Sequence, residues 1–145
     1  ETALPYRDKV FDIAFSAFGA LPFVADLDQA LYEVHRVLRP RGRFVFSVPH
    51  PMRWVFPDDP QVLTAALSYF ERAYLEQDAN DELTYAEFHR TMGDWVRALQ
   101  VRGSFEIHNL IEPEWPEGLD ITWGQWSPER GAIFPGTAIF VCDAR

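Results

Sequence analysis

The first third of the sequence contains the pattern that most constrains the fold: a strand, a helix and a second strand with very little chain between them. Val10–Ser16 reads V-F-D-I-A-F-S, a mostly apolar run typical of a strand buried on both faces. Leu27–Leu38 carries apolar side chains at helical spacing, and Asp26 with Gln29 resembles a capping box. Arg43–Val48 is a second strand. Segments this closely connected predict two parallel strands joined by a right-handed crossover.

After Val48 the pattern changes to a loop that is rich in proline. Apolar side chains between Val62 and Tyr74 then fall at helical spacing, which predicts a second helix, and Asp78–Glu82 is a polar break. A further helix is expected over Met92–Val101, with Thr91 as its N-cap.

The last part of the sequence predicts two more strands separated by a long loop. Phe105–Ile111 and Thr137–Cys142 are the strands, and residues 112–136 form an aromatic loop with several prolines and tryptophans. The 145 residues are expected to form a single domain.

Composition restricts the classes of function. The net charge of −9 disfavours nucleic acid as a substrate, because an acidic body repels phosphate backbones. No apolar run approaches the roughly 20 residues of a membrane-spanning helix, and no membrane partner is expected. The single cysteine, Cys142, cannot form an internal disulfide, which favours a cytoplasmic location.

Three strings resemble class I S-adenosylmethionine-dependent methyltransferases. L-P-Y-R-D-K-V-F-D-I-A-F-S (Leu4–Ser16) is similar to the stretch that carries the fourth strand of that family. A-L-Y-E-V-H-R-V-L-R-P-R-G-R-F-V-F-S (Ala30–Ser47) resembles its A-L-x-E-x-x-R-V-L-K-P-G-G block. F-H-R-T-M-G-D-W-V-R-A-L (Phe88–Leu99) resembles a string seen in one subgroup of that family. Taken together, the strings make the chain similar to the methyltransferase type 11 proteins.

The resemblance implies an α/β fold: the C-terminal part of a doubly wound Rossmann-like sheet with strands 4-5-7-6, the last strand antiparallel. The family's glycine-rich cofactor turn and the acidic residue that binds the ribose have no counterpart in this sequence. The chain is therefore interpreted as truncated before strand 4. Arg41 replaces the first glycine of the P-G-G turn, which is expected to form with Gly42 at positive φ.

The function that the resemblance implies is methyl transfer from S-adenosylmethionine to a small-molecule acceptor, with residues 1–145 alone expected to be inactive. Residues 49–90 are interpreted as a substrate-side insert. Without a first strand beside it, the strand at Phe11–Ser16 would be an apolar edge, so a homodimer through this edge, or else an exchange of elements between copies, is expected.

The resemblance also suggests site residues. The segment at the end of the first strand would lie against the cofactor, and comprises Phe15, Ser16, Ala17 and Phe18. His50 follows the second strand and is a candidate general base, or a hydrogen-bonding anchor for the proline-rich loop. The acceptor side would include Tyr85, His89 and Arg90, the last two of which could equally orient the following helix. No metal-ligand spacing is present.

Several alternatives stay open from the residues alone. The aromatic loop, with Trp115, Trp123, Trp126 and Phe134, could form the lid of an apolar pocket, although packing against its own domain is favoured. The chain could be a non-catalytic binding or dimerisation module derived from a methyltransferase fold. A dehydrogenase ranks last, since it too needs a nucleotide turn.

Overall fold

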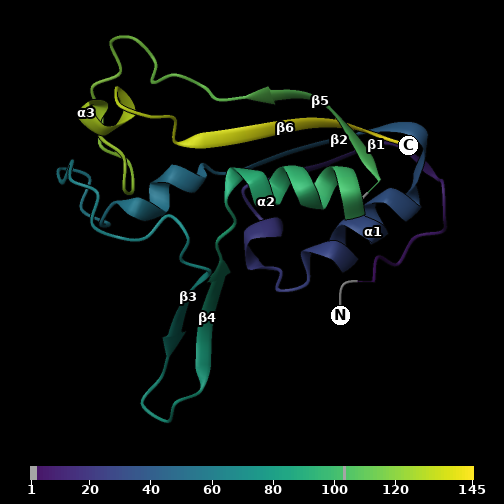
Figure 1. The fold of residues 1–145 in the computed structure, drawn as a ribbon, viewed down its shortest axis with the longest axis horizontal. Coiled ribbons are helices and arrows are strands. Elements are labelled where there is room, and N and C mark those ends of the chain that lie inside the picture. The colour runs from purple at the N-terminus through teal and green to yellow at the C-terminus, as the bar shows by residue number, and fades with distance from the viewer. Residues whose placement is uncertain (1–2, 103) are drawn as a thin grey trace.

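A computed structural model describes residues 3–102 and 104–145, and its centre is a four-stranded sheet with the order β1-β2-β6-β5 (Figure 1). The strands are β1 (Phe11–Ala17), β2 (Leu38–Pro49), β5 (Phe105–Ile111) and β6 (Thr137–Ala144). β1 and β2 are parallel, whereas β6 is antiparallel to both of its neighbours. The expected parallel pair and the expected insertion of the last strand are both confirmed.

Two helices lie on the same face of this sheet (Figure 1). They are α1 (Leu27–Val37) and α2 (Met92–Arg97), which continues as a π-helical turn over Ala98–Arg102. Both predicted caps are confirmed, because Asp26 accepts from the Gln29 amide at 2.9 Å and Thr91 forms a capping box with Asp94. The helices on both faces that a doubly wound sheet implies are not seen in the described residues. None of the helices described is long and apolar enough to cross a membrane.

The main core lies between this face of the sheet and the two helices. Phe46 of β2 stacks on Phe140 of β6 with ring centroids 4.9 Å apart, and Trp95 of α2 packs against both rings. Leu31 of α1 and Leu99 are fully buried in the same cluster. The alternation of buried residues along β2 and the 3.6-residue period of α1 therefore meet in one apolar layer.

The expected helix between Val62 and Tyr74 is wrong. The chain instead forms irregular turns and then a hairpin of β3 (Ala73–Gln77) and β4 (Leu83–Phe88). The predicted apolar face has no surface to pack against, since Leu67 and Phe70 stay exposed. A helix of this length takes most of its stability from such packing, so the segment adopts another structure.

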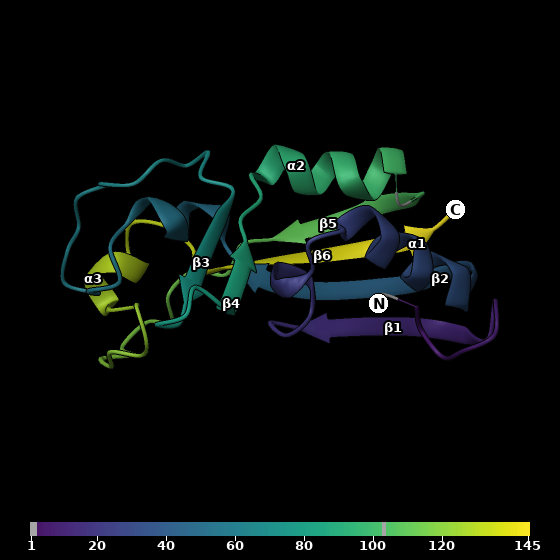
Figure 2. The same cartoon turned by 90° about the horizontal axis from the view of Figure 1, so that it is seen from below.

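The polar break at Asp78–Glu82 is the turn of this hairpin. The Asp78 carboxylate accepts hydrogen bonds from the amides of Asn80 and Glu82, and Asp81 has a positive φ of 62°. A short acidic residue that binds backbone amides two and four residues ahead is a typical turn former. The hairpin and α3 (Pro128–Gly131) lie at the end of the sheet toward which β1 and β2 run (Figure 2).

β1 is an edge strand, as expected, but the burial on both faces that its apolar run predicts is wrong. Its side chains are largely exposed, with Ile13 at 64% and Phe15 at 80% of their full accessibility. Its pairing with β2 leaves the outer row of backbone N–H and C=O groups without a strand partner among the described residues.

In the turn between α1 and the paired part of β2, the residue with left-handed backbone is not the expected one. Arg41, not Gly42, has the positive φ, at 66°. Gly42 is needed for space, because a Cβ there would lie 2.8 Å from the Arg39 carbonyl oxygen. Arg41→Gly is therefore expected to stabilise the chain by about 0.5–1 kcal/mol and to raise Tm by about 2–3 °C. Differential scanning calorimetry checks this, and Arg41→Ala, which keeps the left-handed strain, should give no such gain.

A network around Glu33 of α1 holds the segment before β1. The Leu4 amide donates to Glu33 at 2.8 Å, and Arg36 donates to Glu33 and to Asp8. The hydrogen bonds from Arg36 and then Leu4 lower the pKa of Glu33 from 4.5 to about 2. The stability that this carboxylate contributes is present above pH 4.5 and is lost as the pH falls toward 2. Glu33→Gln should flatten the fall of Tm between pH 5 and about 2, and an unchanged profile would contradict this account.

Candidate functional site

The carboxyl ends of the parallel strands β1 and β2 meet at one end of the sheet. Ala17 is the register partner of Ser47, and the Phe18 amide donates to the Ser47 carbonyl at 3.1 Å. Phe18 has a positive φ of 55°, a conformation that costs energy for a bulky residue and is enriched at functional sites. Open α/β sheets bind ligands at this end. The segment predicted to contact a cofactor, residues 15–18, therefore lies at the ligand end of the sheet.

A cavity of about 510 Å³ opens beside Phe18, and we call it the tryptophan cavity. Its apolar wall is formed by Phe18, Trp54, Trp115, Trp123 and Trp126. Three of these tryptophans come from the 112–136 loop, where Trp123 and Trp126 pair their backbones as an isolated bridge. Trp126 also packs against Phe134 at 5.1 Å between ring centroids. The aromatic loop thus packs on its own domain and lines a pocket at the same time.

A second cavity of about 590 Å³ lies beside the hairpin, and we call it the acidic cavity. Four carboxylates and one guanidinium line it: Asp58, Glu71, Glu76, Glu87 and Arg53. The two cavities share a wall formed by Arg53, Trp54, Tyr85, Glu87 and Gln125. They therefore form adjoining compartments of one site, which extends from the end of β1 to the hairpin.

The shared wall is built on the short 3-10 helix Pro51–Val55 that follows β2. The Arg53 side chain is buried, donates to Gln125 at 2.5 Å and to Asp58 at 2.8 Å, and lies 4.1 Å from the centre of the Trp54 ring. The Trp54 ring also stacks on His89 with centroids 3.6 Å apart. These contacts hold the Trp54 ring against Arg53 of the same 3-10 helix and against His89, which directly follows the hairpin.

His89 was predicted to lie on the acceptor side, and it lines the acidic cavity. Its side chain is buried, and neither ring nitrogen has a hydrogen-bond partner among the described residues. Burial, and then the charge of Arg53, lower the pKa of His89 from 6.5 to about 4. The imidazole is therefore neutral at physiological pH.

Tyr85, also predicted for the acceptor side, lines both cavities and donates to the Glu87 carboxylate at 2.8 Å. Burial, together with this bond, raises the pKa of Tyr85 to about 12. Burial also raises the pKa of Glu87, although the Tyr85 hydrogen bond and the charge of Arg53 oppose the change. A carboxyl group in such surroundings is suited to exchange a proton with a ligand.

His50 has both ring nitrogens engaged in structural contacts. Nδ1 accepts from the Met52 amide at 3.1 Å, which caps the helix after β2, and Nε2 lies 2.7 Å from Glu112 beyond β5. His50 does not line either cavity. The geometry favours the anchoring alternative over a general base, because no nitrogen is left to receive a substrate proton.

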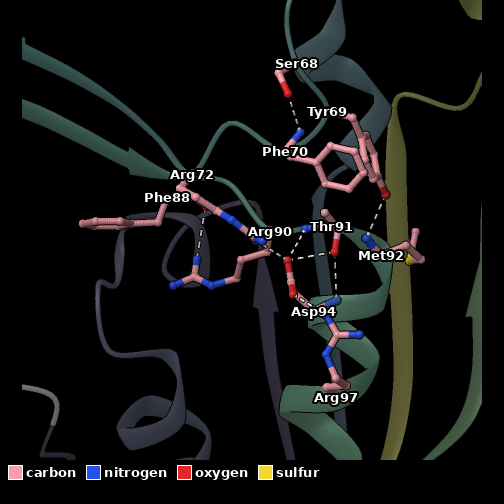
Figure 3. A network of polar contacts seen from close by, with 10 residues as sticks. All are labelled: Ser68, Tyr69, Phe70, Arg72, Phe88, Arg90, Thr91, Met92, Asp94 and Arg97. Carbon is pink, nitrogen blue, oxygen red and sulfur yellow. Dashed lines mark hydrogen bonds and ion pairs between the residues drawn. The ribbon is translucent and has the colours of Figure 1, made fainter.

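Arg90 lies apart from both cavities. Its guanidinium donates to the carbonyls of Phe88, Leu21 and Val24 (Figure 3 shows the bond to Phe88). These bonds connect the base of the hairpin to the 3-10 helix Leu21–Phe23 that follows β1. Arg90 thus positions the hairpin rather than touching a ligand in either cavity.

The Asp94 carboxylate fixes the start of α2 to the hairpin (Figure 3). It accepts from Thr91, from Arg97 and from Arg72. Burial would raise the pKa of Asp94, but these hydrogen bonds outweigh it and lower the pKa. Within the string F-H-R-T-M-G-D, His89 lines the acidic cavity, whereas Arg90, Thr91 and Asp94 form structural hydrogen bonds next to it.

Sequence reasoning did not identify Arg53, Trp54 or Glu87 as site residues. Only Glu87 had a signal in the sequence. Leu83, Tyr85 and Glu87 alternate within a six-residue stretch, which is typical of a strand that carries these three side chains on one face. Across residues 3–102 and 104–145, no group of three or more His, Cys, Asp or Glu side chains could hold a metal ion.

Comparison with known proteins supports the resemblance. Residues 1–46 match the model of a methyltransferase domain family. Malonyl-[acyl-carrier protein] O-methyltransferase 1 of Coxiella burnetii is 46% identical over 50 residues, which cover 34% of this chain and 17% of that protein. The ubiquinone/menaquinone biosynthesis C-methyltransferase UbiE of Hahella chejuensis is 54% identical over 50 residues, covering 32% of this chain and 20% of that protein.

The fold has similar solved structures. One from Listeria monocytogenes, described as an S-adenosylmethionine-dependent methyltransferase, has a TM-score of 0.74 and 22% identity. The likeness covers 99% of this chain and 66% of that one. The chain thus spans less than two thirds of the length of each of these proteins. The comparisons support a methyltransferase domain by sequence over residues 1–46, and the likeness to the solved structures supports the fold. The resemblance to class I S-adenosylmethionine-dependent methyltransferases is confirmed, by sequence over residues 1–46 and by fold over nearly the whole chain.

Proposed function

We propose that this chain forms the acceptor side of an S-adenosylmethionine-dependent methyltransferase that acts on a small molecule. The observation that carries the proposal is the position of the tryptophan cavity, which begins at Phe18. Phe18 directly follows β1, within the region that matches the methyltransferase family. The acceptor would occupy the adjoining cavities, and the methyl group would arrive at the end of β1.

The residues at the end of β1 fit one side of the cofactor. Ser16, Ala17 and Phe18 lie at the carboxyl end of the strand, where Phe18 offers exposed apolar surface. A glycine cradle is not part of this end: the described glycines with positive φ are Gly118 and Gly124, both in the 112–136 loop. When bound, S-adenosylmethionine supplies an activated methyl group, so the role of these residues is mainly to position the acceptor and exclude water.

Weak binding is therefore expected for the cofactor product, S-adenosylhomocysteine. Titrated into the ¹⁵N-labelled chain, it should shift the amide signals of Ser16, Ala17 and Phe18 with a Kd on the order of 1 mM, equivalent to about −4 kcal/mol. A matched titration with adenosine, which lacks the thioether and amino-acid end, should shift these signals less. Shifts confined to other parts of the chain, or none at 5 mM, would contradict the proposal.

A second proposal concerns assembly. We propose that the open edge of β1 pairs with β1 of a second copy. An antiparallel pairing about a two-fold axis at Ile13 would place Phe11 of one copy opposite Phe15 of the other and would cover their exposed rings. Light scattering after size-exclusion chromatography should give twice the chain mass of 16.8 kDa, and Phe15→Lys should give the monomer. A monomeric unmodified chain at 100 µM would contradict this.

A further inference from the structure

Glu87 occupies the wall between the tryptophan cavity and the acidic cavity. Its side chain is held by β4, and the residue retains only 8% of its full accessibility. Tyr85 donates to Oε2, while Oε1 accepts no hydrogen bond from any described residue. A carboxylate has room for about four hydrogen bonds. Glu87 therefore has unused acceptor capacity at the point where the two compartments meet.

Arg53 does not neutralise Glu87 by direct contact. Its guanidinium is committed to Asp58 and Gln125, and Gln125 in turn donates to Asp58 at 3.0 Å. Three further carboxylates line the acidic cavity in addition to the Arg53–Asp58 ion pair: Glu71, Glu76 and Glu87. A cation entering this compartment gains favourable charge interactions, whereas an anion is repelled.

His89 gives an independent indication of a ligand. It retains 8% of its full accessibility, lines the acidic cavity and has two unpartnered ring nitrogens. A buried polar group without a partner is costly, and each such group in a folded protein calls for an explanation. A ligand that brings N–H donors would satisfy the acceptor nitrogen of this neutral ring.

Aromatic side chains in both cavities would contribute to binding of a cationic ligand. Trp54, Tyr74 and Tyr85 line the acidic cavity, and the faces of such rings attract ammonium groups. The tryptophan cavity beside them is suited to a flat apolar body.

We propose that the joined cavities bind an arylalkylamine, with its aromatic ring in the tryptophan cavity and its alkylammonium group at Glu87. This assignment rests on the proposed methyl transfer and specifies its acceptor. Glu87 would take one proton from the ammonium nitrogen, which frees the lone pair. That lone pair then bonds to the transferred methyl carbon while the bond from this carbon to the sulfonium sulfur breaks, so the positive charge passes from sulfur to nitrogen.

The test uses three probes of similar shape: 2-phenylethylamine, 2-phenylethanol and 3-phenylpropionate. Each is titrated into the unmodified chain at pH 7.5, and tryptophan fluorescence excited at 295 nm reports binding. The amine is expected to bind at least tenfold more tightly than the alcohol, and the carboxylate is expected to bind least. Equal binding of the amine and the alcohol, tighter binding of the carboxylate, or no binding of the amine would overturn the proposal.

Two variants locate the effect. Glu87→Gln keeps the size of the side chain and should reduce the preference for the amine about tenfold while leaving the alcohol unaffected. Glu106→Gln, on the exposed part of β5, removes the same charge outside the cavities and should leave the preference intact. A preference that survives Glu87→Gln overturns the assignment. If the amine preference fails while S-adenosylhomocysteine still shifts Ser16–Phe18, only the acceptor class is wrong and the proposed function stands.

Discussion

Replacing Arg130 with alanine is expected to destabilise the chain by about 3–5 kcal/mol, because three carbonyl oxygens lose a charged donor. Arg130 of α3 retains 1% of its full accessibility and donates to the carbonyls of Gln125, Asp59 and Val62. Its guanidinium also lies 5.4 Å from the centre of the Phe56 ring. One side chain thus joins the turns after the 3-10 helix to the aromatic loop that lines the tryptophan cavity.

Urea unfolding followed by circular dichroism measures this loss, and tryptophan fluorescence reports the aromatic loop separately. Arg130→Lys should recover only part of the stability, since a single ammonium cannot reach three carbonyls as a guanidinium does. Arg43→Ala serves as the control: it removes an exposed ion pair with Asp143 and should cost less than about 1 kcal/mol. A cost for Arg130→Ala as small as that of the control would show that the loops are held by other contacts.

Acidification is expected to lower the free energy of unfolding by about 2–3 kcal/mol between pH 7.5 and 4.5 through His89 alone. The pKa of His89 is lowered to about 4 in the folded chain, so between that value and 6.5 the unfolded chain binds more protons. The stability linked to the neutral ring is present above pH 6.5 and is lost as the pH falls toward 4. Arg53 strengthens the effect because its charge repels the protonated ring.

The matched variant is His89→Phe, whose ring can stack on Trp54 as the imidazole does but cannot be protonated. Glu87 titrates in both proteins, so the difference between their pH profiles isolates His89. Urea unfolding at intervals of half a pH unit should show the variant losing less stability than the unmodified chain below pH 6.5. Parallel profiles would mean that His89 is not buried as a neutral group.

The central sheet could be predicted because local patterns and distant contacts agree there. The alternation along β2 and the helical period of α1 each define a single apolar face, and those faces meet around Phe46 and Leu31. The segment between Val62 and Tyr74 shows the opposite case. Its apolar spacing suits a helix, but no described surface covers that face, and Phe70 is exposed.

The candidate site could be predicted in part, at the end of β1 and, through the family resemblance, at Tyr85 and His89. Residues 15–18 follow from the rule that ligands bind at the carboxyl ends of parallel strands. Glu87 could not be found in this way, because its role depends on Arg53 and Gln125, which are distant in the sequence. The structural contact of His50 could not be predicted for the same reason, since its partner Glu112 lies 62 positions away.

The most direct test of the central claim is an inter-ligand nuclear Overhauser measurement with S-adenosylhomocysteine and 2-phenylethylamine added together to the chain. The account predicts cross-peaks between the methylene protons beside the sulfur and those beside the amine nitrogen, because the sulfur would reach from the end of β1 into the tryptophan cavity, whose wall includes both Phe18 and Glu87. These cross-peaks should weaken in Glu87→Gln and persist in Glu106→Gln. Binding of both ligands without any cross-peak between them would contradict the claim that the joined cavities form the acceptor side of a methyl-transfer site.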